Sequence, residues 1–148
     1  MARIAEDRII ADAIAIIERR FHRGEVLSSP RDSADYFKLK LGRFPYEVFG
    51  CLLLDNRHAV LGWVELFRGT VNGTEVHARE VVRVCMEYNA CAVIFSHQHP
   101  SGIAEPSAAD CTITRTLRDA LKLIDVRVID HLVIGKGEPV SMAVRGLI

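Results

Sequence analysis

The spacing of apolar residues along the chain predicts alternating helices and strands. Between residues 4 and 21 the apolar positions recur with the period of an amphipathic helix, and Ser29-Pro30 is typical of the start of a second helix, which Gly42 ends. Apolar runs bounded by turn residues predict strands. The predicted helices are residues 4–21, 30–41, 78–89 and 107–123, and the predicted strands are residues 46–54, 59–67, 91–96, 126–135 and 140–144.

This order of elements indicates a layered α/β domain. Helices interleaved with strands cover both faces of a sheet, which gives three layers. Residues 46–54 are apolar on both faces of the predicted strand, so we expect this strand in the centre of the sheet. The chain contains no internal repeat and no interdomain linker, and the helix at 4–21 is interpreted as an appendage.

Composition and charge narrow the class of protein. The chain has 148 residues, 49% of them hydrophobic, which corresponds to one globular domain. Lys plus Arg and Asp plus Glu number 19 each, so the formal net charge is zero, which argues against a nucleic-acid-binding protein that relies on a broad basic field. No apolar run approaches the roughly 18 residues of a membrane span, and the charged N-terminus does not have the pattern of a signal peptide.

The cysteines indicate the redox compartment. None of the four stands in a C-x-x-C arrangement, and three lie in apolar runs, where a thiol behaves as a small buried hydrophobe. We therefore expect a reducing, cytoplasmic location rather than a disulfide framework or a cysteine-based zinc site. The cysteines are Cys51, Cys85, Cys91 and Cys111.

The stretch from residue 96 to residue 110 carries the candidate chemistry. His97 and His99 are two residues apart at the end of a predicted strand, so both imidazoles project to the same side while Gln98 faces away. Asp110 lies at the start of the next helix and can supply an oxygen ligand. Two histidines, one carboxylate and an open fourth position are typical of a catalytic zinc site. The alternative for Ser107-x-x-Asp110 is a capping motif of the helix without a ligand role.

The same residues resemble a known metalloenzyme motif. His97-x-His99, seven residues, Ser107, two residues and Asp110 have the spacing of the JAB1/MPN/Mov34 metalloenzyme (JAMM) motif, and the surrounding sequence resembles the RadC family from about residue 33 to residue 148. The segments that carry this resemblance are Gly69-Thr70, residues 78–82, 96–102, Pro106-Ser107 with Asp110, and 130–135. Gln98 departs from the Asn common in the family, and we expect little effect because it points away from the metal.

The resemblance implies a fold and a chemistry. It implies a three-layer α-β-α MPN (cytidine deaminase-like) domain with a mixed central sheet at 33–148, preceded by an N-terminal helical extension at 1–32. It further implies Zn²⁺ bound by His97, His99 and Asp110, with water in the fourth position, and Ser107 hydrogen-bonded to the developing oxyanion. The helix-hairpin-helix region of longer RadC proteins is absent upstream, so we expect a short, single-domain member.

Such a site also needs a general base, a carboxylate within one hydrogen bond of the attacking water. By residue chemistry the candidates are Glu47, Glu65, Glu80 and Glu87. The resemblance places the family's glutamate at Glu47, in Glu47-Val48-Phe49-Gly50-Cys51-Leu52-Leu53, and Glu65 is the second choice. The alternative for Glu47 is an exposed carboxylate at a strand start.

These features predict a zinc hydrolase that cuts an amide, peptide or isopeptide bond in a peptide or protein substrate. One alternative is a DNA-repair-associated accessory protein of the RadC family, with nucleic-acid binding not favoured by the balanced charge. Another is a catalytically silent scaffold. We expect no membrane association, and self-association into a homo-oligomer is compatible with the sequence. Specificity is expected in the loops at 68–75 and 102–106.

Two further pairs are interpreted as structural. Asp130-His131 resembles a family Asp-His pair but is expected to be a polar pair at a strand entry. Arg79 and Arg83 are expected on a solvated helix face.

Overall fold

The predicted elements recur in the computed structural model, which describes residues 2–20, 24, 26–27, 30–69 and 76–148. In order along the chain they are α1 (Ala2–Arg20), α2 (Pro30–Leu41), β1 (Val48–Leu54), β2 (Val60–Arg68), α3 (Ala78–Glu87), β3 (Ala92–Gln98), α4 (Ala108–Lys122), β4 (Arg127–Ile134) and β5 (Val140–Ser141). The expected end of the first helix at Phe21, Ser29 before the second helix, and the loop at 70–75 lie outside the described residues.

Two boundaries differ from the prediction. β3 continues through Gln98, beyond the predicted strand end at residue 96, because His97 and Gln98 still pair with Val133 and Ile134 of β4. β5 is shorter than expected, because residues 142–146 form turns instead of a longer strand.

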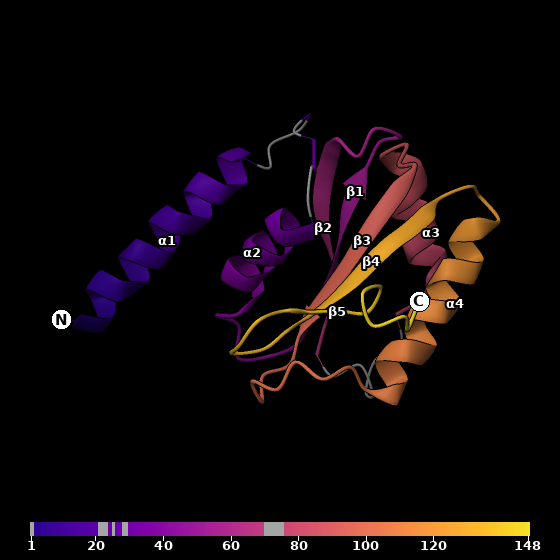
Figure 1. Cartoon of the computed structure of the whole chain (residues 1–148). Coiled ribbons are helices and arrows are strands. Elements are labelled where there is room, and N and C mark those ends of the chain that lie inside the picture. Colours follow the sequence, from indigo (N-terminus) through magenta and orange to yellow (C-terminus); the bar gives the residue numbers. More distant parts are fainter. Residues whose placement is uncertain (1, 21–23, 25, 28–29, 70–75) are drawn as a thin grey trace.

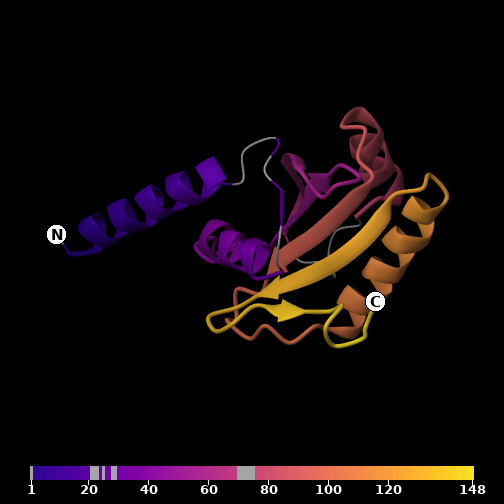
Figure 2. The ribbon, with the colours of Figure 1, turned by 45° about the horizontal axis from the view of Figure 1, so that its top comes forward.

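The described strands form one mixed five-stranded sheet in the order β2-β1-β3-β4-β5 (Figures 1 and 2). β3 and β4 are parallel, and the other neighbouring pairs are antiparallel. Every residue of β1 is buried, and β1 lies between β2 and β3. β1 is therefore an inner strand, as its apolar faces predict, while β3 occupies the middle of the sheet.

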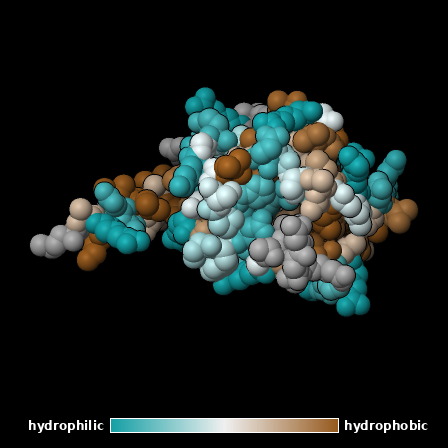
Figure 3. All heavy atoms as spheres, turned by 90° about the horizontal axis from the view of Figure 1, so that it is seen from below, coloured by the Kyte–Doolittle hydropathy of each residue, from teal (hydrophilic) through white to brown (hydrophobic). Residues whose placement is uncertain are grey.

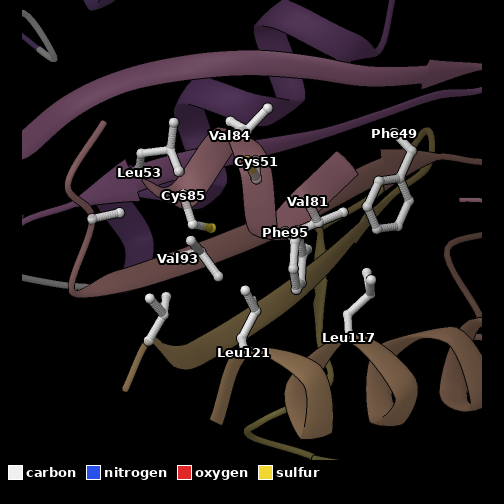
Figure 4. Packing of buried hydrophobic residues seen from close by; sticks show 12 residues of the cluster. Phe49, Cys51, Leu53, Val81, Val84, Cys85, Val93, Phe95, Leu117 and Leu121 are labelled. Atoms are coloured by element: carbon white, nitrogen blue, oxygen red, sulfur yellow. The ribbon is translucent and has the colours of Figure 1, made fainter. Parts of the chain in front are cut away.

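Helices cover both faces of the sheet, which confirms the three layers. On one face, α3 and α4 pack through residues such as Val81, Cys85 and Leu117 against Phe95 and the other side chains shown in Figure 4. On the other face, α2 contributes a second core cluster, in which Phe37 is fully buried. Both clusters draw on β1 and β3, because alternate side chains of a strand point to opposite faces.

α1 projects from this layered body (Figures 1 and 2). Ile4 and Ile9 are 73% and 67% exposed, and Figure 3 shows hydrophobic side chains along the projecting helix. Ile14 is buried, and the carboxylate of Glu18 lies 3.2 Å from the ammonium group of Lys40 on α2. None of the helices in the described ranges has the length and apolar character needed to cross a membrane.

The segment that connects β3 to α4 is held against the end of β4. The N–H of His99 donates to the carbonyl of Ile134 at 2.8 Å, and the N–H of Lys136 donates to the carbonyl of Gly102 at 2.9 Å. Gly102 has a φ of +86°, and a Cβ on Gly135 would lie 2.5 Å from the Gly102 carbonyl oxygen. Glycine is therefore required at both positions, and the segment returns the chain to the start of α4 beside β3.

Candidate metal centre

The two histidines of the sequence motif face each other at the carboxyl end of β3. The Nε2 atoms of His97 and His99 are 3.0 Å apart. His97 is fully buried, whereas the side chain of His99 is 16% exposed. The strand geometry thus brings the two imidazoles to the same side, as the spacing predicts, with one of them in contact with solvent.

Asp110 completes this cluster from the first turn of α4. Its Oδ1 lies 3.1 Å from Nε2 of His97, and its Oδ2 lies 3.2 Å from Nε2 of His99. The same carboxylate accepts a hydrogen bond from the N–H of Ser107 at 2.7 Å, while the Ser107 hydroxyl oxygen accepts from the N–H of Asp110 at 3.1 Å. Ser107 and Asp110 therefore form a capping box, and this role is compatible with an oxygen directed at the histidines.

The hydrogen-bond partner of Nδ1 determines the tautomer of His99 and hence whether Nε2, which faces the cluster, has a lone pair. Nδ1 of His99 lies 2.8 Å from the carbonyl oxygen of Ile103, which can only accept, so Nδ1 is the donor. In the neutral imidazole, Nε2 then carries the lone pair. The hydrogen bond with Asp110 raises the pKa of His99, against the lowering effect of burial.

The charge of the carboxylate is stabilised by the same contacts. Burial raises the pKa of Asp110, but its hydrogen bonds with His97 and His99 outweigh burial and hold that pKa well below its ordinary value. Asp110 is therefore ionised at neutral pH and available as an anionic ligand.

The donor set fits a tetrahedral metal ion. Zinc–nitrogen and zinc–oxygen bonds of about 2.1 Å at tetrahedral angles place neighbouring ligand atoms about 3.4 Å apart. The two Nε2 atoms are 3.0 Å apart, and they lie 3.1 Å from Oδ1 and 3.2 Å from Oδ2 of Asp110, respectively. A cation between these atoms would meet the imidazole nitrogens and an ionised carboxylate, so the arrangement is chemically suited to a divalent ion.

Glu47 approaches the cluster from the position directly before β1, the neighbouring strand. Because Phe49 pairs with His97 in the antiparallel register, Glu47 comes opposite His99, and its Oε1 lies 3.9 Å from Nε2 of His99. Single ligand atoms of Glu47, His97 and His99 all lie within 4.8 Å of one another, so these three residues form a group that can hold a metal ion. Glu47 is partly buried rather than an exposed carboxylate at a strand start.

The other carboxylate candidates have different neighbours. Glu65 on β2 pairs with Arg68, and Glu80 and Glu87 on the exposed side of α3 both pair with Arg83. The expectation of a solvated helix face at Arg83 agrees with this arrangement. Of the four glutamates considered from the sequence, the structure therefore brings Glu47 to the histidines.

Sequence reasoning missed the role of Gln98. Its side chain points away from the imidazoles, as expected, but it is buried and bound to the backbone on both sides of Glu47. Its Oε1 accepts from the N–H of Val48 at 2.8 Å, and its amide group donates to the carbonyl of Tyr46. This geometry argues against the expectation that Gln98 has little effect on the site, because Gln98 fixes the backbone that carries Glu47.

Sequence reasoning also misplaced His131. It was expected in a polar pair at a strand entry, but it lies within β4, is fully buried, and its Nε2 is 2.7 Å from Nδ1 of His97. Burial and then the neighbouring His97 hold the pKa of His131 well below its ordinary value, so this imidazole is neutral. The neighbouring Asp130 has a structural role, because its carboxylate accepts hydrogen bonds from the hydroxyl of Ser141 and the N–H of Ala143. The only sequence signal for His131 was the family-like Asp-His pair.

His99 is one of the residues that line a groove of about 340 Å³. Its lining includes Phe44, Pro100 and Ile134, and the cationic residues Lys38, Arg43 and Lys136. Lys38 also lies 3.9 Å from a carboxylate oxygen of Glu138. The groove thus connects the solvent-accessible imidazole with a surface that combines apolar and positively charged side chains.

Comparison with known proteins gives consistent similarities. The sequence model of a family described as RadC-like JAB domain matches residues 27–147. A UPF0758 protein of Marinobacter nauticus is 53% identical over 132 residues, which are 89% of this chain and 59% of the relative. A UPF0758 protein of Halorhodospira halophila is 56% identical over 129 residues, which are 87% of this chain and 58% of the relative.

A third relative has a length similar to that of this chain. A UPF0758 protein of Vibrio cholerae is 46% identical over 144 residues, which are 97% of this chain and 90% of the relative. The chain therefore spans about three fifths of the first two relatives and nearly all of the third.

Proposed function

The chain belongs to the family of RadC-like JAB domains, and on this premise we propose that it is a zinc-dependent metallohydrolase that cleaves an amide, peptide or isopeptide bond. The observation that carries the proposal is the convergence of His97, His99 and Asp110, with ligand atoms 3.0 to 3.2 Å apart and Glu47 beside them. This combination is suited to catalysis because three protein ligands leave the fourth zinc position open.

The proposal divides the four residues into ligands and base. Nε2 of His97, Nε2 of His99 and a carboxylate oxygen of Asp110 would hold the ion, because the two nitrogens lie 3.0 Å apart and each lies 3.1 or 3.2 Å from one of the two Asp110 oxygens. Glu47 is farther away, at 3.9 Å from Nε2 of His99. That distance supports a role for Glu47 in accepting a proton rather than in binding the ion. When bound, zinc supplies a water of lowered pKa, near 7, and polarises the substrate carbonyl.

The residues of the chain then move the proton and stabilise the charge. Glu47 accepts a proton from the attacking water and transfers it to the amide nitrogen as the carbon–nitrogen bond breaks, which leaves a free amine and a carboxylic acid. Ser107 lies at the exposed start of α4, and its hydroxyl accepts from the N–H of Asp110. The hydroxyl hydrogen can therefore be donated to the oxyanion that forms on the carbonyl oxygen.

The groove beside His99 is the proposed site for the substrate chain. The partly exposed His99 lines it, and the apolar side chains of the groove can bury part of a peptide. The positively charged side chains of Arg43 and Lys136 on its lining support a preference for acidic residues in that peptide.

The test combines metal analysis with a cleavage assay. The full chain is purified, its zinc content is measured by mass spectrometry, and it is incubated with quenched fluorescent peptide libraries that contain linear and lysine-branched amide bonds. The variant Glu47→Gln and the matched control Glu65→Gln, which changes a glutamate paired with Arg68, are treated identically.

We expect one zinc per chain in all three proteins and cleavage by the wild type and Glu65→Gln. Glu47→Gln should cleave about 10²- to 10⁴-fold more slowly, the usual contribution of a general base. Wild-type protein that does not bind zinc after dialysis against it, or equal cleavage by Glu47→Gln, would overturn the proposal.

A further inference from the structure

A continuous line of buried polar groups runs from the site into the core behind it. Nδ1 of His97 is 2.7 Å from Nε2 of His131, and Nδ1 of His131 is 2.6 Å from Oγ1 of Thr114. Oγ1 of Thr114 in turn donates to the backbone carbonyl of Asp110 at 2.6 Å. His97, His131 and Thr114 are each 0% exposed.

The Asp110 carbonyl at the end of this line determines which group donates in each hydrogen bond. The carbonyl oxygen of Asp110 can only accept, and a threonine hydroxyl has one hydrogen, which it donates there. Oγ1 of Thr114 must then accept from Nδ1 of His131, so in the neutral imidazole of His131 the lone pair lies on Nε2. That lone pair accepts from Nδ1–H of His97, which leaves Nε2 of His97 with its own lone pair toward the candidate metal centre.

We propose that Thr114 and His131 are positioning residues that hold His97 in the tautomer required of a metal ligand. This inference rests on the proposed function, because it assigns the two residues to the same metal centre. A metal-binding histidine commonly donates its other ring N–H to a buried acceptor, which sets both the tautomer and the ring orientation. Here the acceptor is a second imidazole, whose own tautomer is set by a hydroxyl.

α4 carries both the proposed ligand Asp110 and Thr114, the last side chain of the line. Thr114 follows Asp110 by one turn of α4, so its hydroxyl reaches back to the Asp110 carbonyl while its side chain contacts β4. The opposite direction, with Thr114 donating to His131, would place a hydrogen on Nε2 of His97, where it would compete with the ion. The two directions of hydrogen-bond donation therefore differ in whether Nδ1 or Nε2 of the neutral His131 imidazole carries the hydrogen.

The first measurement uses the metal-free wild-type protein. Nitrogen-15 chemical shifts and two-bond couplings of the imidazole rings identify the protonated nitrogen of each histidine. We expect His131 to carry its hydrogen on Nδ1 with Nε2 unprotonated. A hydrogen on Nε2 of His131 would overturn the inference. This readout does not depend on zinc binding or on activity.

The second measurement compares zinc affinity in matched valine variants, with a chromophoric chelator as competitor. Thr114→Val removes the hydroxyl but keeps the shape of the side chain, and Thr116→Val makes the same change at an exposed position of α4, where the hydroxyl bonds only to the carbonyl of Thr112 among the described contacts. We expect Thr114→Val to weaken zinc binding about 10- to 100-fold, the typical effect of such outer partners, and Thr116→Val to bind as the wild type does.

The outcomes separate this inference from the proposed function. Wild-type protein that binds zinc, together with equal affinity in Thr114→Val, overturns the inference and leaves the metal site intact. Wild-type protein that binds no zinc overturns the proposed function, and the nitrogen-15 measurement then decides the direction of the hydrogen bonds alone. If Thr114→Val does not fold, that same wild-type measurement decides the inference.

Discussion

The side-chain amide of Gln98 spans the backbone on both sides of Glu47. It accepts a hydrogen bond from the N–H of Val48 at 2.8 Å and donates to the carbonyl of Tyr46, while the carboxylate of Glu47 itself points to His99 on the other face of the sheet. Gln98 lies between His97 and His99 in sequence. The strand that carries the two histidines therefore also holds the glutamate in register with them.

From this relationship we predict the effect of Gln98→Leu, which removes both hydrogen bonds from a buried position. The free energy of unfolding should fall by about 1–3 kcal/mol, because the N–H of Val48 loses its partner. Cleavage should fall more than zinc content, since Glu47 shifts while the histidines remain. Denaturant unfolding, metal analysis and the peptide assay together check this prediction. Unchanged cleavage in a folded variant would contradict it.

A second prediction concerns metal binding and stability. Zinc should stabilise the folded protein, because it binds a site that the unfolded chain lacks, by about 2.7 kcal/mol at a free zinc concentration of 100 times the dissociation constant. Asp110→Asn should abolish this stabilisation, although asparagine keeps an oxygen for the N–H of Ser107. Asp119→Asn, an exposed position on the same helix, serves as the control and should keep it. Thermal unfolding with and without zinc measures the difference.

A third prediction separates the two roles of Ser107. Ser107→Ala should lower the free energy of unfolding by about 0.5–2 kcal/mol, because the N-cap of α4 is lost, whereas Ser107→Gly should cost only a few tenths. Both variants lack the hydroxyl donor and should cleave about 10²- to 10³-fold more slowly. If Ser107→Gly cleaves as fast as the wild type, Ser107 acts as a cap alone.

A fourth prediction concerns thiol reactivity. Burial raises the pKa of the Cys85 thiol to about 11 and also raises the pKa of Cys51, where the neighbouring Cys85 adds to the effect. At pH 8 only roughly a thousandth of Cys85 is thiolate, and the thiolate is the nucleophile. Iodoacetamide should therefore label the partly buried Cys91 and Cys111 first. Mass spectrometry of the digested protein locates the label, and rapid labelling of Cys51 or Cys85 in folded protein would contradict the prediction.

The residues of the candidate centre differ in how far the sequence could predict them. His97 and His99 are two residues apart at the end of one strand, so the period of a strand alone places both imidazoles on one side. Ser107 and Asp110 are three residues apart at a helix start, so the capping geometry follows from local spacing as well. Local rules of this kind do not depend on how distant segments pack.

Long-range pairing decided the remaining residues. Glu47, Glu65, Glu80 and Glu87 are equivalent by residue chemistry, and the antiparallel register of β1 against β3 brings Glu47 opposite His99. His131 reaches His97 only because β4 lies parallel to β3.

The sequence by itself determined the order of the elements, the layered α/β fold and the spacing of the histidine pair and the helix cap, because each depends on the period of one strand or helix. The tertiary structure placed beside the histidines Glu47, which the family resemblance favours but residue chemistry does not distinguish from the other glutamates. It alone decided that Gln98 holds the backbone of Glu47 and that His131 and Thr114 lie behind His97. These contacts join segments far apart in the chain, and their geometry is set by strand register and by the packing of α4 on the sheet.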